Sequence, residues 1–122
     1  MITEKAMEMI RDYIQTTFLF YNVGRGGDTT GINATSLDAP INATNLNNST
    51  GSITTDKTGL TSLDFTITLN GSDYVGEIIR EVGIFDSATL ASANMLIRVP
   101  FNAIGPLTAS DTIELVVTVD VI

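Results

Sequence analysis

The segment LDFTITL (63–69) alternates apolar and polar side chains without interruption. Successive side chains of a β-strand point to opposite faces, so this alternation is typical of a strand with one face on a core and the other in solvent. The segment TIELVVTVDVI (112–122) follows the same rule, with apolar side chains on one face at Ile113, Leu115, Val117, Val119 and Val121. Both segments predict a fold that is mainly β-sheet.

Three more segments have the composition of strands. TTFLFYNVG (16–24) and EIIREVGIFD (77–86) are largely apolar, and we expect the first to be buried on both faces. MLIRVPF (95–101) follows a polar turn, and NGSD (70–73) is itself a turn sequence. Strands at roughly ten-residue spacing with turns between them are typical of an antiparallel β-sandwich or an open barrel. The strand-rich half of this single domain (1–122) spans about residues 63–122.

An N-terminal amphipathic helix is predicted over about residues 2–14. Thr3 is a candidate N-cap, and Glu4 next to it suits the positive end of a helix. Apolar side chains recur at three- and four-residue spacing and form an apolar stripe, made of Ile2, Ala6, Met9, Ile10 and Tyr13. We expect this stripe to pack over the sheet.

A loop-rich segment is predicted over about residues 25–62. Gly, Thr, Asn and Ser dominate it, and it holds no aromatic residue. Such residues favour local backbone hydrogen bonds and turns, so we expect long loops with short edge strands. Isolated apolar residues should anchor these loops to the core: Ile32, Leu37, Ile41, Leu46, Ile53 and Leu60.

Composition removes several classes of function. The formal net charge is −8, from 14 acidic and 6 basic residues, which disfavours nucleic acid and anionic membranes as partners. There is no Cys and no His, so disulfides, thiolate nucleophiles and the usual general base are missing. No apolar run approaches the ~20 residues of a membrane span, and the charged N-terminus lacks a signal peptide's apolar stretch. We therefore expect a protein that is made in the cytoplasm and is not an enzyme.

The remaining catalytic candidates are carboxylates. Glu77, Glu81 and Asp86 lie close in sequence, and a pair of carboxylates suffices for glycoside hydrolysis. Residues 77 and 81 share one face of a regular strand while 86 falls on the other, so we favour an ion pair between strands. Glu81 stands among apolar neighbours and should be half-buried beside a donor. We predict no catalytic, cofactor-binding or metal residues; a cation site assembled from distant loops would leave no spacing signature.

The segment IIREVGIFD (78–86) is the most informative stretch. Gly83 interrupts an apolar strand, which usually marks a bulge or a close backbone approach. The pattern resembles the core signature of small tailed-phage virion modules, including the collar-side N-terminal domains of phage tail-fibre proteins. The order of the neighbouring elements is similar as well. The signature positions in this chain are Arg80, Glu81, Gly83, Ile84, Phe85 and Asp86.

This resemblance implies a non-enzymatic virion structural protein that needs no cofactor. It would be a small oligomeric tail-fibre or baseplate adaptor, or a capsid decoration protein, made in the host cytoplasm and assembled into the virion. Its partners would be copies of itself, in a homotrimer or other cyclic oligomer, and other virion proteins of tail or capsid, but neither nucleic acid nor membrane. Candidate subunit contacts are the helix and two apolar residues on the second face of the last strand, Val116 and Ile122.

An alternative function is a small β-sandwich binding module. Its Thr/Asn-rich loops, within residues 25–62, would recognise a carbohydrate or a protein. The loops lack aromatic residues on which a sugar ring could stack, which weighs against a carbohydrate ligand.

Overall fold

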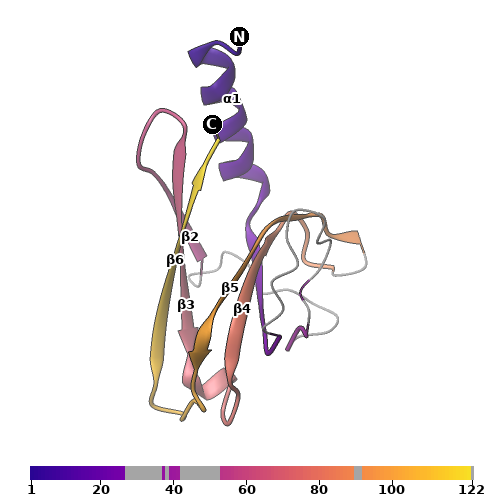
Figure 1. Ribbon diagram of the computed structural model, residues 1–122, viewed down its shortest axis with the longest axis vertical. Helices are drawn as coiled ribbons and strands as arrows, with labels where there is room; N and C mark the ends of the chain where they lie inside the picture. The colour runs from indigo at the N-terminus through magenta and orange to yellow at the C-terminus, as the bar shows by residue number, and fades with distance from the viewer. Residues whose placement is uncertain (27–36, 38, 42–52, 90–91, 122) are drawn as a thin grey trace.

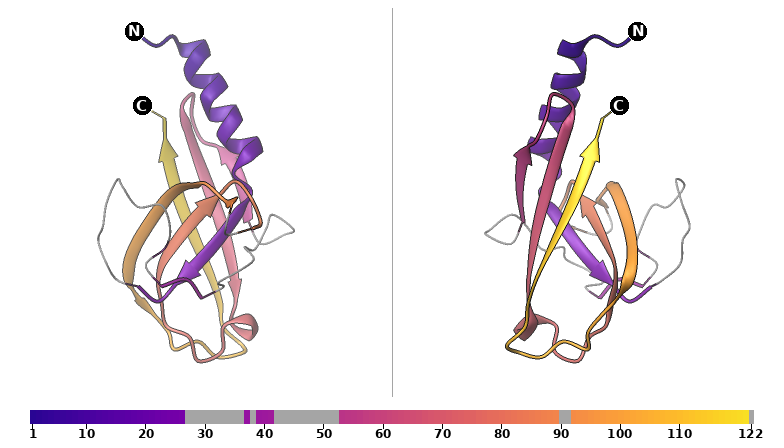
Figure 2. Two further views of the ribbon diagram at one scale, coloured as in Figure 1. Left: turned by 90° about the vertical axis from the view of Figure 1, so that its right-hand side faces the viewer. Right: turned by 60° about the vertical axis from the view of Figure 1, so that its left-hand side comes forward.

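The computed structural model describes residues 1–26, 37, 39–41, 53–89 and 92–121. These residues form two three-stranded antiparallel sheets that face each other, with one helix at the N-terminus (Figures 1 and 2). The first sheet has the order β1 (Phe20–Gly24), β4 (Ile79–Phe85), β5 (Met95–Ile104), and the second has the order β2 (Ile53–Lys57), β3 (Ser62–Asn70), β6 (Thr112–Asp120). The sheets are not closed into a barrel, so the prediction of a sandwich is confirmed.

The core lies between the two central strands, β3 and β4. The apolar positions of β3 are buried and alternate with half-exposed polar ones, as its sequence predicts. β3 pairs with β6 from Ser62 opposite Asp120 to Asn70 opposite Thr112, so the apolar face of β6 extends the same surface. β4 is buried at every position except Arg80, since it is flanked by β1 and β5 within its sheet and covered by the other sheet.

The helix α1 (Glu4–Thr17) is capped as predicted but runs further along the chain. The Thr3 hydroxyl oxygen accepts a hydrogen bond from the Ala6 N–H at 3.1 Å. The helix continues three residues beyond the predicted end because the Thr16 hydroxyl donates to the Asp12 carbonyl and the Phe18 N–H donates to the Ile14 carbonyl. The β-propensity of the Thr-rich segment from residue 16 is thus overridden, and β1 begins only at Phe20.

The prediction that the apolar stripe packs over the sheet is wrong. α1 rises beyond the end of the sandwich and contacts it mainly along the β2–β3 hairpin (Figures 1 and 2). Ile14 is the buried residue of the helix, and it lies outside the stripe. The hairpin occupies the side of the helix that carries Arg11 and Gln15, so the stripe faces away.

The loop-rich segment behaves largely as predicted where it is described. β2 is a short edge strand, and Leu37 and Ile53 are buried anchors. The anchoring prediction is wrong for Leu60, which is exposed because it lies in the turn between β2 and β3, beyond the sheet core. Two further predicted anchors, Ile32 and Leu46, lie outside the described residues.

Candidate functional site

Glu81 forms the predicted ion pair between strands, and the pair is buried. Its side chain on β4 is 0% exposed, and that of Arg98 on β5 is 3% exposed. The Arg98 Nε donates to Glu81 Oε1 at 2.9 Å. Burial goes further than the half-burial expected from sequence, because the loop segments around residues 26 and 39 cover the carboxylate.

The second oxygen of Glu81 fastens the base of a loop. Oε2 accepts hydrogen bonds from the backbone N–H groups of Gly26, at 2.9 Å, and Ala39, at 2.8 Å. We call this set the Glu81 clamp: Glu81, Arg98 and these two N–H groups. It joins two strands to both ends of the segment 27–38, and since each carboxylate oxygen is bonded, the burial of its charge is compensated.

Gly24 allows the loop to approach the clamp. A Cβ atom at this position would lie 2.7 Å from the Ala39 carbonyl oxygen. The Arg25 N–H donates to that same carbonyl at 2.9 Å, and Gly24 forms a bridge with Pro40. A side chain at residue 24 would therefore displace the strand-like segment that the clamp holds.

The other signature residues also have structural roles. Arg80 is exposed and donates to the Arg25 carbonyl at 3.4 Å, and Ile84 is fully buried in the core. A Cβ at Gly83 would lie 2.9 Å from the Phe85 ring and 3.0 Å from Leu37 Cδ2. The predicted close approach is confirmed, but the atoms that approach belong to side chains rather than to backbone, and the nearest register shift of the β4–β5 ladder falls between Ile84 and Phe85.

Asp86 closes the turn that follows β4. Its Oδ1 accepts from the Asn94 N–H at 2.6 Å, and its Oδ2 accepts from the Asn94 side-chain amide at 2.9 Å. These hydrogen bonds favour the charged carboxylate and hold the pKa of Asp86 below its ordinary value. The last residue of the signature thus fastens a second loop, residues 86–94.

The three carboxylates considered for catalysis have separate partners. Glu77 forms a two-pronged ion pair with Arg25, at 2.5 and 2.7 Å, and this hydrogen bonding lowers the pKa of Glu77 and raises that of Arg25. Glu81 is enclosed in its clamp, and Asp86 is bonded to Asn94. Among the described residues no three acidic side chains gather as a metal site would require. Each of the three carboxylates is therefore bonded to its own donors, and Glu81 and Asp86 connect their strand to neighbouring loop residues.

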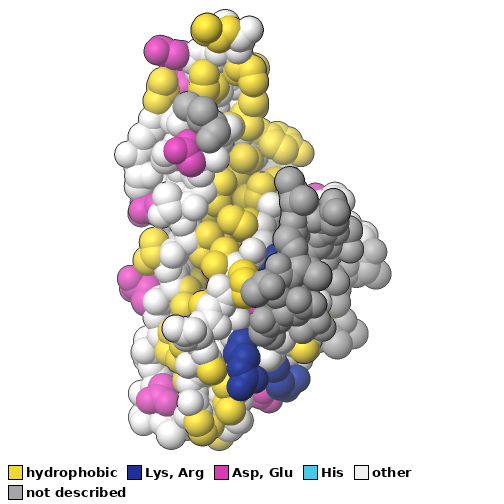
Figure 3. Space-filling view, in the orientation of Figure 1, with side chains coloured by type: hydrophobic (Ala, Val, Ile, Leu, Met, Phe, Trp, Pro, Cys, Tyr) yellow, Lys and Arg dark blue, Asp and Glu magenta, His cyan; other side chains and the backbone are white. Residues whose placement is uncertain are grey.

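The apolar stripe of α1 is largely exposed. Met9 is 61% exposed and Tyr13 62%, and Ile2 and Ile10 are exposed as well. Figure 3 shows apolar side chains running along the helix and continuing down the face between the two sheets. Isolated exposed apolar residues are ordinary, but a continuous run of them marks an interaction surface.

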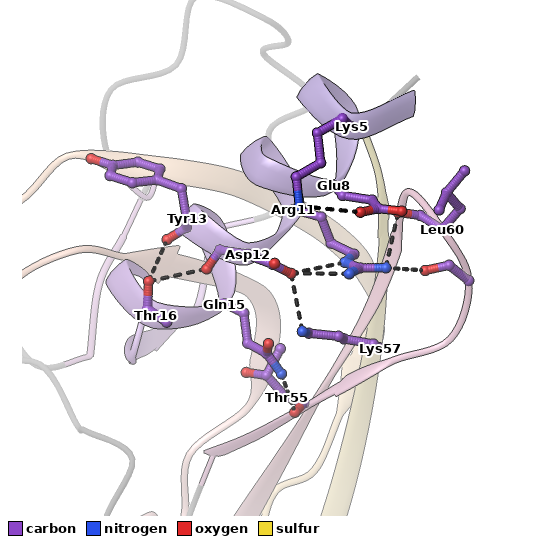
Figure 4. A network of polar contacts seen from close by, with 11 residues as sticks. Lys5, Glu8, Arg11, Asp12, Tyr13, Gln15, Thr16, Thr55, Lys57 and Leu60 are labelled. Carbon is purple, nitrogen blue, oxygen red and sulfur yellow. Dashed lines mark hydrogen bonds and ion pairs between the residues drawn. The ribbon is translucent and has the colours of Figure 1, made fainter. Parts of the chain in front are cut away.

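Polar contacts hold the opposite side of α1 to the β2–β3 hairpin. Arg11 Nη1 donates to the carbonyl oxygens of Gly59, at 2.8 Å, and Leu60, at 2.9 Å. Asp12 forms an ion pair with Lys57 at 3.1 Å, while Tyr13 points away from this network (Figure 4). The helix is therefore positioned by its polar side, which leaves the apolar stripe turned outward.

A hollow of about 410 Å³ opens where the sheets diverge between β5 and β6. Apolar side chains line it, among them Val99, Phe101, Ile104, Leu115 and Val117. Sequence alternation in 112–122 places Leu115 and Val117 on the inward face, but it gives no sign that the sandwich is open on this side, because alternation indicates a face of a strand and not what covers that face. Figure 3 shows apolar side chains along this face of the molecule.

Of the two candidate subunit contacts on the last strand, one is described. Val116 lies on the outer face of β6 and is 56% exposed. Ile122 lies outside the described residues, as do most of the Thr/Asn-rich loops of the alternative binding function. Val116 and the apolar stripe are therefore the exposed apolar residues that we take as the candidate site.

Together these features describe a small β-sandwich with fastened loops and outward apolar surfaces. No protein-family model matches the chain, and no curated protein sequence is similar enough to indicate a relative. No helix in the described part of the chain is long and apolar enough to cross a membrane. Function is therefore inferred from the geometry.

Proposed function

We propose that this chain is a non-enzymatic structural protein of a tailed-phage virion, which acts by packing against copies of itself and against neighbouring virion proteins. It would serve as a small oligomeric tail-fibre or baseplate adaptor, or as a capsid decoration protein. The observation that carries the proposal is the outward apolar stripe of α1, on a helix whose polar side is already used to hold it in place.

Self-association would remove this stripe from water. Complete burial of one large apolar side chain stabilises a complex by about 1.5–3 kcal/mol, so Met9 and Ile10 offer a substantial driving force on a short helix. Closed cyclic symmetry is the usual outcome when identical chains bury such a surface. A net charge of −8 suits a protein that works beside a packaged genome without binding it.

The fastened loops give further support. Glu81 and Asp86, two residues of the segment that resembles tail-fibre modules, each fix the base of a loop. Hydrogen bonds to these carboxylates hold Gly26, Ala39 and Asn94 in place, which suits a module that keeps a fixed geometry within an assembly.

The first test compares a stripe variant with a matched control by light scattering after size-exclusion chromatography. We expect Met9→Gln/Tyr13→Gln to reduce the molar mass of the wild-type oligomer without loss of helical circular dichroism. The control Glu4→Gln/Lys5→Gln changes exposed helix residues outside the stripe and should keep the wild-type mass. An unchanged mass for the stripe variant would contradict a role of this surface in assembly.

The second test addresses the virion. Mass spectrometry of particles purified from the producing culture should detect this chain, and immunogold labelling should then place it. Label at the tail tip or collar would indicate an adaptor, and label over heads a decoration protein. Absence of the chain from purified particles would contradict the virion assignment.

A further inference from the structure

Among the described residues, β6 is an edge strand without the proline or register shifts that often protect such strands. It is the outermost strand of its sheet, with β3 as its neighbour among the described residues. Its nine residues, TIELVVTVD, contain no Pro and no Lys, and its ladder with β3 has no register shift. The outer strand β5, on the same side of the sandwich, carries Pro100 and two register shifts. Proteins commonly blunt edges with such devices, so β5 is protected against strand pairing, whereas on β6 only the charges of Glu114 and Asp120 oppose it.

The hydrogen bonds at both ends of the β3–β6 ladder show which backbone groups face this edge. The Val121 N–H donates to the Thr61 carbonyl at 2.9 Å, and the Gly71 N–H donates to the Asp111 carbonyl at 2.7 Å. Hydrogen-bonded pairs alternate along an antiparallel ladder, so the odd-numbered residues of β6 bond to β3. The N–H and C=O groups of Glu114, Val116 and Thr118 are therefore directed away from β3.

We propose that a second copy of this chain pairs with this edge, β6 antiparallel to β6, across a twofold axis at Val116. This inference rests on the self-association in the proposed function and names one of its interfaces. Val116 is the central residue of β6 and the one large apolar side chain exposed on the strand's outer face. Pairing about it matches the whole strand with itself and places Val116 of one copy beside Val116 of the other.

The charges of β6 favour the register centred on Val116 over the register centred on Val117 and over a parallel arrangement. The register centred on Val116 sets Glu114 of one copy opposite Thr118 of the other, and Asp120 opposite Thr112, so every carboxylate faces a threonine. A shift of the twofold axis by one residue, to Val117, would set Glu114 opposite Asp120. A parallel arrangement would oppose Glu114 to itself. Like charges directly opposite each other destabilise a sheet, all the more in a chain of net charge −8.

The resulting dimer has a continuous six-stranded sheet with β6 of both copies at its centre. The pairing satisfies the outward N–H and C=O groups of β6 and covers Val116. The apolar stripe of α1 lies on a separate element, so both surfaces can act in the same assembly. A stripe variant should accordingly retain the β6 dimer while losing any larger oligomer.

Cysteine crosslinking tests the register directly because the chain contains no cysteine. Hydrogen-bonded antiparallel pairs have Cα atoms about 5.5 Å apart, within the range of a disulfide. We expect Val116→Cys, oxidised with copper phenanthroline, to form a disulfide-linked dimer. Glu114→Cys alone should stay monomeric on a denaturing gel, because the two copies of this residue would be about 14 Å apart along the strand. A mixture of Glu114→Cys and Thr118→Cys should crosslink.

The control variant Val75→Cys replaces another exposed apolar residue, outside β6, and measures crosslinking by collision. Crosslinking of Val116→Cys at this background level, while wild type remains oligomeric in solution, would overturn the β6 interface and leave the proposed self-association intact. Efficient crosslinking of Glu114→Cys alone would overturn the antiparallel register. A monomeric wild type would instead remove the self-association on which both proposals rest.

Discussion

Two carboxylates join distant parts of this chain through ion pairs, Glu81 with Arg98 and Asp12 with Lys57, and their surroundings differ completely. Glu81 is 0% exposed and meets Arg98 and two backbone N–H groups. Asp12 is 49% exposed and meets Arg11 and Lys57. A buried charge that loses its partner still carries the full cost of desolvation. An exposed charge that loses its partner is solvated by water and screened by salt. The same kind of interaction, a carboxylate paired with a basic side chain, therefore fixes the fold in one place and only orients a helix in the other.

The largest expected effect follows from Glu81→Gln. The amide nitrogen cannot accept a hydrogen bond, so one donor of the clamp loses its partner and Arg98 keeps a buried charge. We expect the free energy of unfolding to fall by about 3–5 kcal/mol, measured by urea denaturation. Glu77→Gln, which breaks an ion pair at the surface, is the matched control and should cost much less. Equal losses of unfolding free energy in the two variants would contradict the claim that the buried ion pair contributes more to stability than the exposed one.

The packing next to the clamp can be tested at Gly83. In Gly83→Ala the new methyl group would meet the Phe85 ring and Leu37, which must move. Overpacking of this kind costs about 1–3 kcal/mol of unfolding free energy. Gly59→Ala is the control, since its nearest neighbour atoms lie at 3.7 Å, an ordinary contact distance. A Gly83→Ala protein as stable as wild type would mean that the side chains of Phe85 and Leu37 can move aside at no cost in stability.

For Asp86 we expect an effect on stability that depends on pH and is smaller than the effect at Glu81 but larger than the effect at Asp12. Its pKa is lowered in the folded protein by the hydrogen bonds from Asn94, so its contribution to stability is present above the unfolded pKa and is lost as pH falls through the folded pKa. Asn94→Ala removes the side-chain donor and should reduce the drop in Tm between neutral and acidic pH. An identical drop in wild type and variant would contradict this role.

The smallest effect is expected for Asp12→Asn. The pKa of Asp12 is lowered by its hydrogen bonds to Lys57 and Arg11, but the group is in contact with water. Arg11 still holds the carbonyl groups of the hairpin turn, so α1 should remain docked. We expect a small decrease in Tm that disappears at high salt. A loss comparable with that of Glu81→Gln would show that the helix depends on this ion pair.

The sequence pattern predicted most of the strands, because a strand that is buried on one face alternates apolar and polar residues. LDFTITL and TIELVVTVD became β3 and β6, with their apolar faces inward. Arg98 was missed as the partner of Glu81, although a single charged residue within the apolar run MLIRVPF is the same kind of signal as Glu81 itself. The backbone donors of Gly26 and Ala39 leave no trace in sequence, since any residue supplies an N–H group.

The facing of α1 could not be predicted from amphipathicity. The period of the apolar stripe shows that one side of the helix differs from the other, but not which side meets the rest of its own chain. Here the polar side does so, because Arg11 reaches the carbonyl groups of Gly59 and Leu60. The position of β6 at the edge of its sheet could not be predicted from sequence either, because it depends on which strands pair with each other.

Sedimentation equilibrium of the wild-type chain over a wide range of concentrations is the most direct test of self-association. If the outward stripe of α1 and the edge of β6 serve assembly, the protein sediments as a closed oligomer of defined size that dissociates reversibly on dilution. A monomer at every concentration, extending to tens of micromolar, would contradict the claim that this chain works by packing against its own copies.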